Sequence, residues 1–183
     1  IGEIRDLETA EVSIQAALTG HLIISTIHSN SAAGAIPRFL SMGVKPFLLA
    51  PALRAVMGQR LVRKLCKQCK KQVELTPDIQ KRIEGAFNEA GPGVKAPELS
   101  TTAFFGPVGC TECSNQGYAG RFGIYEIFKM DDIIEALVLK GDASEAEIKT
   151  AAIKQGMITL VQDGIFKAAT GVSSLDEVFR VAE

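Results

Sequence analysis

The stretch that decides the fold class reads Thr19-Gly20-His21-Leu22-Ile23-Ile24-Ser25-Thr26-Ile27-His28-Ser29-Asn30. Its centre, residues 22–27, is almost continuously apolar and β-branched, which is typical of a parallel strand covered on both faces. A helical pattern over residues 7–19 comes just before it and follows the N-cap candidate Asp6. A helix that leads into a buried parallel strand predicts an α/β fold.

Spacing and capping signals predict further elements on the C-terminal side of this stretch. In the first half they are a helix capped by Asn30 that ends at Gly43, a helix from Pro46 to about Gly58, a strand over 59–65, and a helix after Thr76 that ends at Gly91. A loop over 91–103 and a strand over 123–128 follow. The remaining elements are a helix capped by Asp131 or Asp132 that runs to Lys140, a helix that follows a capping box of Ser144 and Glu147 and stops at Gly156, and helices over about 159–170 and after Ser173 or Ser174.

The composition excludes several classes of protein. The chain has 183 residues, of which 46% are hydrophobic and 22% charged, so it can bury a sizeable core. Its apolar runs fall far short of the roughly 18 residues that span a bilayer, so we predict no membrane span. The first residue is Ile1, and no charged region leads into an apolar one. We therefore expect an internal piece of a longer protein without a signal peptide.

Charge is distributed unevenly along the chain. Between Val12 and Val73 there is no Asp or Glu, but there are nine Lys or Arg residues. A basic segment can bind nucleic acid, yet the interleaved aromatic residues of a single-strand platform are missing, since Phe39 and Phe47 are the only rings there. A local anion, such as a phosphate or metal-bound thiolates, fits better. We predict no nucleic-acid partner, and a nucleic-acid-binding zinc ribbon is the less favoured alternative.

All four cysteines belong to two C-x2-C pairs, Cys66 with Cys69 and Cys110 with Cys113. Each pair can place two sulfurs on one metal ion, and two pairs complete a tetrahedral Cys₄ site with no position left open for a substrate. The 40 residues between the pairs exceed the usual 15 to 20, so residues 76–103 are interpreted as an insertion. Buried free thiols and two disulfides are the alternatives. We expect a structural zinc ion.

Glu3 and His28 are candidate catalytic residues because of their positions. His28 ends the predicted strand, at the edge where open α/β sheets bind ligands. Nucleotide hydrolases keep at this edge a carboxylate that orients Mg²⁺ or the attacking water, a role that suits Glu3. The alternatives are a helix cap or surface charge for Glu3 and a hydrogen-bonded structural role for each histidine. His21 lies at the other end of the strand, about 20 Å away.

The chain contains no G-x-x-x-x-G-K-[ST] motif, the loop that cradles the β- and γ-phosphates of a nucleotide. We therefore expect that the chain alone does not hydrolyse a nucleotide.

Several motifs together resemble one known family, the type II/type IV secretion ATPases. They are Gly2-Glu3-Ile4-Arg5-Asp6-Leu7-Glu8-Thr9-Ala10, Thr19-Gly20-His21-Leu22, Ser25-Thr26-Ile27-His28-Ser29-Asn30, Gln59-Arg60-Leu61-Val62-Arg63, the two cysteine pairs, and Gly120-Arg121-Phe122-Gly123-Ile124-Tyr125-Glu126. The branch that drives type II secretion and type IV pilus assembly looks most similar. Pilus retraction proteins typically lack the four cysteines.

The resemblance implies that the chain is the C-terminal portion of a hexameric, RecA-like motor. Such a motor is cytoplasmic, lies peripherally at the inner membrane and uses Mg-ATP to work on an inner-membrane platform protein. The resemblance assigns Glu3 as the general base or water-orienting group and His28 as a group that senses or stabilises the γ-phosphate. It adds His21 and Arg5 as nucleotide-site candidates, without a role for His21.

We therefore predict an α/β fold made of a partial RecA-like ATPase core, an inserted tetracysteine zinc element and a C-terminal helical subdomain. Residues 1–65 form the C-terminal part of the ATPase core, residues 66–118 the tetracysteine zinc-binding element with its helical insertion, and residues 119–183 a strand with the helical subdomain. The alternative function is a non-enzymatic zinc-bearing protein-interaction module.

Overall fold

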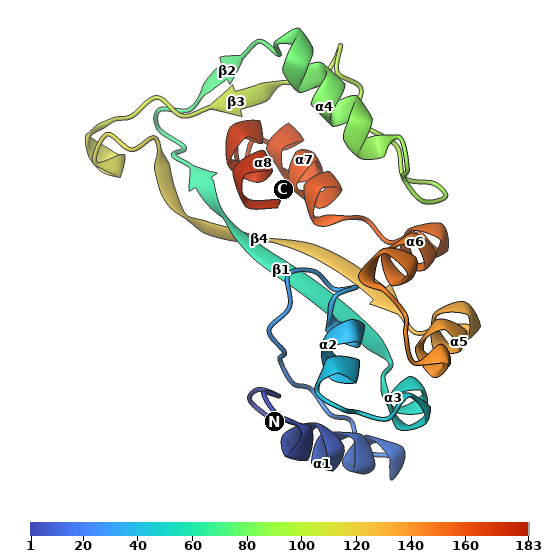
Figure 1. The fold of residues 1–183 in the computed structure, drawn as a ribbon. Helices are drawn as coiled ribbons and strands as arrows, with labels where there is room; N and C mark the ends of the chain where they lie inside the picture. The colour runs from blue at the N-terminus through green and yellow to red at the C-terminus, as the bar shows by residue number, and fades with distance from the viewer. Residues whose placement is uncertain (183) are drawn as a thin grey trace. The chain divides into compact units, whose positions relative to one another are not determined.

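The computed structural model describes residues 1–182 and has a mixed α/β fold. Figure 1 shows its elements, which are α1 (Leu7–Leu18), α2 (Ala35–Ser41), α3 (Pro46–Ala52), β1 (Ala55–Leu65), β2 (Lys71–Val73), α4 (Pro77–Phe87), β3 (Phe104–Gly106), the 3₁₀ helix η1 (Thr111–Cys113), β4 (Tyr118–Lys129), α5 (Asp132–Lys140), α6 (Glu145–Gln155), α7 (Leu160–Ala169) and α8 (Leu175–Ala182).

The chain folds into two compact units, each built from two separate stretches of sequence. The first unit comprises residues 1–58 and 127–157, and the second comprises residues 59–126 and 158–183. The three parts predicted from the sequence, 1–65, 66–118 and 119–183, stay a prediction, because compactness alone does not identify a functional part.

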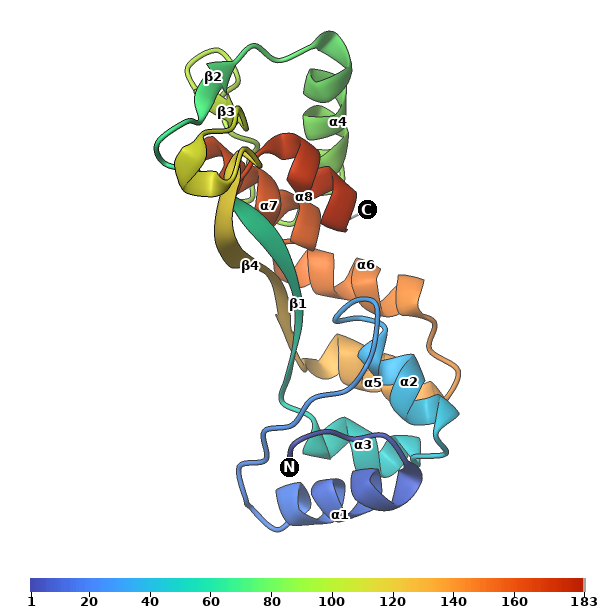
Figure 2. The same cartoon turned by 90° about the vertical axis from the view of Figure 1, so that its left-hand side faces the viewer.

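The first unit is a helical assembly around one apolar core. Helix α3 packs against α1 and α5, and α5 packs against α6, as Figure 2 shows. Ile36, Ile134 and Ile148 are completely buried in this core. Each comes from a different helix, so burial of their apolar side chains is what holds α2, α5 and α6 together.

Three helix N-caps in the first unit, those of α1, α5 and α6, are as predicted. Asp6 is the N-cap of α1, and its side chain accepts a hydrogen bond from the backbone N–H of Thr9. Asp131 is the N-cap of α5, and its side chain accepts one from the backbone N–H of Ile134. Ser144 and Glu147 form the predicted capping box of α6, which ends at Gly156. Such caps satisfy N–H groups that have no partner within the helix, and they depend only on nearby residues.

Two helix boundaries in the first unit differ from the prediction. Helix α2 begins at Ala35 with Gly34 as its N-cap, not after Asn30. Pro37 therefore lies in the first turn of α2, where a backbone N–H has no partner within the helix and its absence costs no hydrogen bond. Helix α3 ends at Ala52 because the chain then enters β1, so the prediction that this helix continues to Gly58 was wrong.

The strand predicted over residues 22–27 is also wrong, although the segment is extended. The N–H of Ile4 donates to the carbonyl oxygen of Thr26 at 2.8 Å, and the terminal amine of Ile1 lies 3.4 Å from the carbonyl oxygen of Ile24. The segment therefore runs parallel to residues 1–4. These few bonds do not make a regular ladder. The outward-facing Leu22 and Ile24 are 86% and 76% exposed, so no second layer covers them in the described residues.

The second unit combines paired strands with helices. Strand β1 pairs with β4, and the short strands β2 and β3 pair antiparallel, with Gln72 opposite Phe105. Helix α7 packs against α8 and α4. Strand β4 runs from Tyr118 to Lys129, so it begins five residues before the strand predicted over residues 123–128. The second core is formed by Ile83, Phe104, Ile165, Ala168, Leu175, Val178 and Phe179.

A buried carboxylate fixes helix α8 to strand β1 within the second unit. The side chain of Glu177 is completely buried, and its two oxygens accept hydrogen bonds from the guanidinium groups of Arg63 and Arg180, each at 2.7 Å. The backbone N–H of Arg63 also donates to Glu177. Burial alone raises the pKa of the Glu177 carboxyl, but the two arginines outweigh it and lower this pKa from 4.5 to about 2.

Candidate functional site

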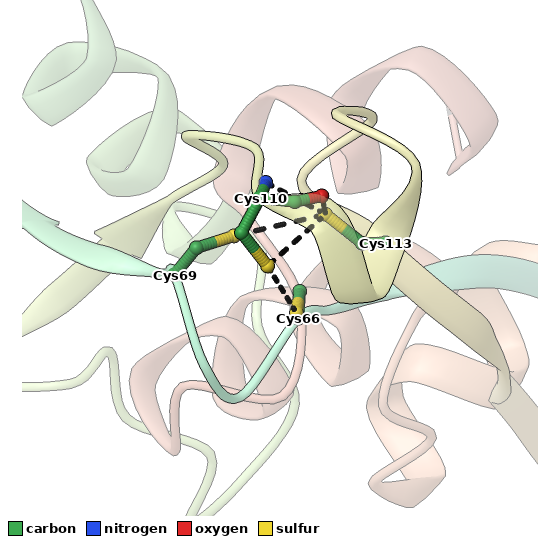
Figure 3. Close-up of side chains that lie close together, drawn as sticks. All are labelled: Cys66, Cys69, Cys110 and Cys113. Atoms are coloured by element: carbon green, nitrogen blue, oxygen red, sulfur yellow. Dashed lines mark hydrogen bonds between the residues drawn. The ribbon is translucent and has the colours of Figure 1, made fainter.

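The four cysteines converge on one point in the second unit. Cys66 and Cys69 lie in the turn after β1. Cys110 is the N-cap of the 3₁₀ helix η1 and Cys113 is its last residue, so the two pairs come from segments 44 residues apart in sequence. Figure 3 shows the four side chains pointing toward one another. All four sulfur atoms lie within 4.8 Å of one another.

The spacing of the sulfurs fits a tetrahedral zinc site. The Cys66–Cys110, Cys69–Cys113 and Cys110–Cys113 sulfur pairs are 3.9, 3.8 and 3.8 Å apart. Four sulfurs bound to one zinc ion at about 2.3 Å each are about 3.8 Å from one another. The cysteines are free, and a disulfide would require sulfurs at about 2.0 Å, so the structure does not support the alternative of two disulfides.

Backbone N–H groups surround the sulfurs. The N–H of Gly109 donates to the sulfur of Cys69 at 3.3 Å, and the N–H groups of Cys110 and Gly117 each donate to that of Cys113 at 3.2 Å. Burial raises the pKa of the Cys113 thiol, but these two donors outweigh it and lower the pKa from 9 to about 7. Burial raises the pKa of Cys110 to about 11. The donors therefore stabilise a thiolate, the form that binds metal.

Two basic residues near the first cysteine pair, Arg63 and Lys70, are bound to other groups of the second unit. Arg63 is bound to Glu177. The ammonium group of Lys70 donates to the carbonyl oxygen of Gly171 at 2.7 Å and lies over the ring of Phe105. These two side chains connect structural elements of the second unit, whereas backbone N–H groups donate directly to the sulfurs of Cys69 and Cys113.

Glu3, Arg5 and His28 form a cluster in the first unit. Nε2 of His28 lies 2.7 Å from Oε1 of Glu3, and Nε of Arg5 donates to Oε2 of Glu3 at 2.6 Å. The hydrogen bond from Arg5 holds the pKa of the Glu3 carboxyl below its ordinary value of 4.5. The His28 side chain is 88% exposed, whereas that of Glu3 is only 20% exposed. The cluster thus presents an ionised carboxylate with an accessible imidazole beside it.

His21 does not join this cluster. Its Nδ1 lies 3.2 Å from the hydroxyl of Thr19 and 3.2 Å from the carbonyl oxygen of Ala16, at the C-terminal end of α1. Of the four residues predicted for the nucleotide site, the structure brings together Glu3, Arg5 and His28.

Two polar contacts join distant residues that no sequence motif connects. Ser31 donates to Glu145 at 2.6 Å, and Arg63 binds Glu177. Both contacts join residues 114 positions apart in sequence. No local pattern marks such a pair. The only sequence signal is the contrast between the acid-free segment over residues 13–72 and the acid-rich C-terminal third.

Comparison with known proteins places these observations in a family. Residues 1–180 match the model of the family described as "Type II/IV secretion system protein". The chain is 44% identical to the type IV pilus assembly ATPase PilB of Myxococcus xanthus over 97% of its own length and 30% of that protein. It is also 44% identical to the type II secretion system protein E of Klebsiella pneumoniae, over 100% of its own length and 34% of that protein.

The fold agrees with a solved structure. The X-ray structure of the Legionella pneumophila ATPase DotB matches 98% of this chain and 36% of that one, with a TM-score of 0.60 and 17% sequence identity. Within residues 1–182, no helix combines the length and the apolar character that crossing a bilayer needs. The chain spans about a third of the length of the two curated relatives described above. With nearly its whole length matched by the family model, the chain belongs to the type II/IV secretion system protein family.

Proposed function

We propose that the chain is the C-terminal portion of a cytoplasmic, hexameric ATPase that powers type II secretion or type IV pilus assembly through an inner-membrane platform protein. Family membership and the names of the similar proteins support this proposal. The observation that carries it is the 2.7 Å contact between Glu3 and His28, because it joins the two residues that the sequence predicts to be catalytic.

In this proposal each residue of the cluster has a separate task. Mg-ATP, when bound, supplies the phosphoanhydride bond that is cleaved. Glu3, whose pKa is lowered by Arg5, stays ionised and accepts a proton from water or orients it. The exposed ring of His28 would donate a hydrogen bond to a phosphate oxygen of the bound nucleotide, and Arg5, which contacts Glu3, would supply positive charge nearby. His21 remains a nucleotide-site candidate without an assigned task.

We also propose that the four cysteines hold one structural zinc ion. The sulfur spacing and the backbone donors described above support this choice of metal. The ion would join the turn after β1 to the segment around η1. It would thereby close the excursion through β2, α4 and β3 at its base.

Steady-state ATP hydrolysis by the longer protein that contains this chain tests the ATPase proposal. Glu3→Gln should lower kcat by about 100-fold or more, because it removes the base while keeping the shape of the side chain. Glu11→Gln, at an exposed position on α1, is the matched control and should leave kcat unchanged.

The 183-residue chain alone should show no turnover in a phosphate-release assay. Turnover by this chain that Glu3→Gln abolishes would contradict our view that the absent phosphate-binding loop is essential. A longer protein that binds zinc but hydrolyses no ATP would instead support the alternative of a non-enzymatic interaction module.

A further inference from the structure

The loop that follows His28 is held by a residue from α6, within the first unit. The hydroxyl of Ser31 donates to Oε1 of Glu145 at 2.6 Å. The same hydroxyl accepts a hydrogen bond from the backbone N–H of Gly34 at 2.9 Å. Both hydrogen-bonding functions of Ser31 are thereby used, and its orientation is fixed from two sides.

The close approach of Glu145 is favoured by the absence of a side chain at Gly34. A Cβ atom on Gly34 would lie 3.2 Å from Oε2 of Glu145 and 3.3 Å from the hydroxyl of Ser31. The carboxylate therefore rests directly on the backbone at the start of α2. Two residues of this loop thus fit the contact with Glu145: Ser31 supplies the hydroxyl that donates to the carboxylate, and Gly34 leaves room for it.

The hydrogen bonds continue from Ser31 toward His28. The hydroxyl of Ser29 donates to the carbonyl oxygen of Ser31 at 2.8 Å, which makes the short segment between them a closed turn. Ser29 is the direct neighbour of His28, whose Nε2 lies 2.7 Å from Glu3. A contact at the start of α6 is therefore connected through two serines to the backbone that carries the candidate catalytic imidazole.

We propose that Glu145 is a positioning residue for His28, acting through Ser31 and the 29–34 turn. The inference rests on the proposed function, because it concerns the same histidine. The exposed ring of His28 has little packing of its own, so its position depends on the backbone that bears it. Glu145 holds that backbone by a charge-assisted hydrogen bond, which is stronger than a neutral one.

The chain offers a direct probe of His28, because it contains only two histidines. In a ¹³C–¹H correlation spectrum of the ring carbons, His21 and His28 each give one set of signals. Glu3→Gln gives the reference position of the His28 signal without the carboxylate contact. In Glu145→Ala and in Ser31→Ala, the His28 signal should move toward this reference position, while the His21 signal stays in place.

Glu147 supplies the matched control. It lies in the same first turn of α6, but it caps the helix by bonding to Ser144 and has no contact with Ser31. Glu147→Ala weakens the start of α6 and should leave the His28 signal unchanged. Glu145→Gln retains an oxygen that accepts from Ser31, so it should restore most of the wild-type position of the signal.

The kinetic measurement uses the longer protein. Glu145→Ala should lower kcat about 10-fold with KM within about twofold, since a misplaced catalytic group affects the chemical step more than binding. The double variant Ser31→Ala, Glu145→Ala should be no slower than either single variant, because both remove one contact.

Two results would overturn the proposal. One is an unchanged His28 signal in a folded Glu145→Ala protein, and the other is an equal displacement by Glu147→Ala, which would mean general loosening of α6. If the His28 signal moves as expected but the longer protein hydrolyses no ATP, the coupling of Glu145 to His28 stands and the proposed ATPase function fails.

Discussion

Replacing Glu177 by glutamine should destabilise the second unit more than any other single charge removal that we consider. The side chain is completely buried, and both of its oxygens are bound by arginines. Glutamine keeps the size and one acceptor oxygen, but it removes the negative charge and leaves Arg63 and Arg180 close together without a counterion. Both arginine side chains are about half exposed, so water can partly hydrate them.

The magnitude follows from the pKa of the carboxyl. A pKa lowered from 4.5 in the unfolded chain to about 2 in the folded one means that the folded protein favours the ionised form. This preference is equivalent to about 3 kcal/mol of stability at neutral pH. We therefore expect Glu177→Gln to lower the free energy of unfolding by about 3 kcal/mol at pH 7.

The pH dependence has a definite sign. Because the folded pKa is the lower one, the stabilisation is fully present above pH 4.5 and is lost as the pH falls toward 2. About 2 kcal/mol of it should already be gone at pH 3. The difference between wild type and Glu177→Gln should therefore shrink with acidification, whatever the other carboxylates contribute to both proteins.

Urea denaturation followed by circular dichroism at pH 7 and at stepwise lower pH measures this difference. Asp176→Asn is the matched control, since Asp176 lies next to Glu177 in the first turn of α8 but is exposed. Asp176→Asn should lower the free energy of unfolding by less than about 1 kcal/mol, which is the usual size of a helix-dipole effect. A Glu177→Gln cost no larger than that of Asp176→Asn, or one independent of pH between 7 and 3, would refute the reasoning.

Two further predictions concern the second unit. Cys110→Ser should reduce bound zinc from about one ion per chain to none by elemental analysis, and it should speed amide exchange in α4; a full zinc content would contradict the four-cysteine site. Gly164→Ala should lower the free energy of unfolding, measured by urea denaturation, by about 1 to 3 kcal/mol, because the added Cβ would lie 2.3 Å from a methyl group of Val178. Adding Val178→Ala should relieve that clash, and a neutral Gly164→Ala would show that α7 and α8 can separate freely.

The parts of the fold that depend on neighbouring residues could be predicted from the sequence. The caps at Asp6 and Ser144 and the end of α6 at Gly156 need only a few adjacent positions, and the structure confirms all three. The two cysteine pairs are also local motifs, and each brings two sulfurs together by itself. Only the meeting of the pairs required the longer-range fold.

The parts that depend on distant pairing were predicted less well. Residues 22–27 have the composition of a buried strand, but a strand exists only where a partner continues the ladder, and residues 1–4 offer too little. Strands β2 and β3 were missed because each has only three residues, too few for a periodic pattern. Of the candidate catalytic residues, Glu3 and His28 were identified by position, while Glu145 has no local signal of any kind.

The contacts of Glu145 and Glu177 change the interpretation of the uneven charge distribution in the sequence. From sequence alone, the acid-free segment over residues 13–72 suggests a local anion, such as a phosphate or metal-bound thiolates. In the structure, two acidic residues of the C-terminal third reach back to this segment, where Glu145 binds Ser31 and Glu177 binds Arg63. The absence of local acids leaves these groups without competing partners nearby in sequence. Two acidic residues of the C-terminal third thus have partners within the acid-free segment, and each of these contacts joins distant stretches of sequence within one unit.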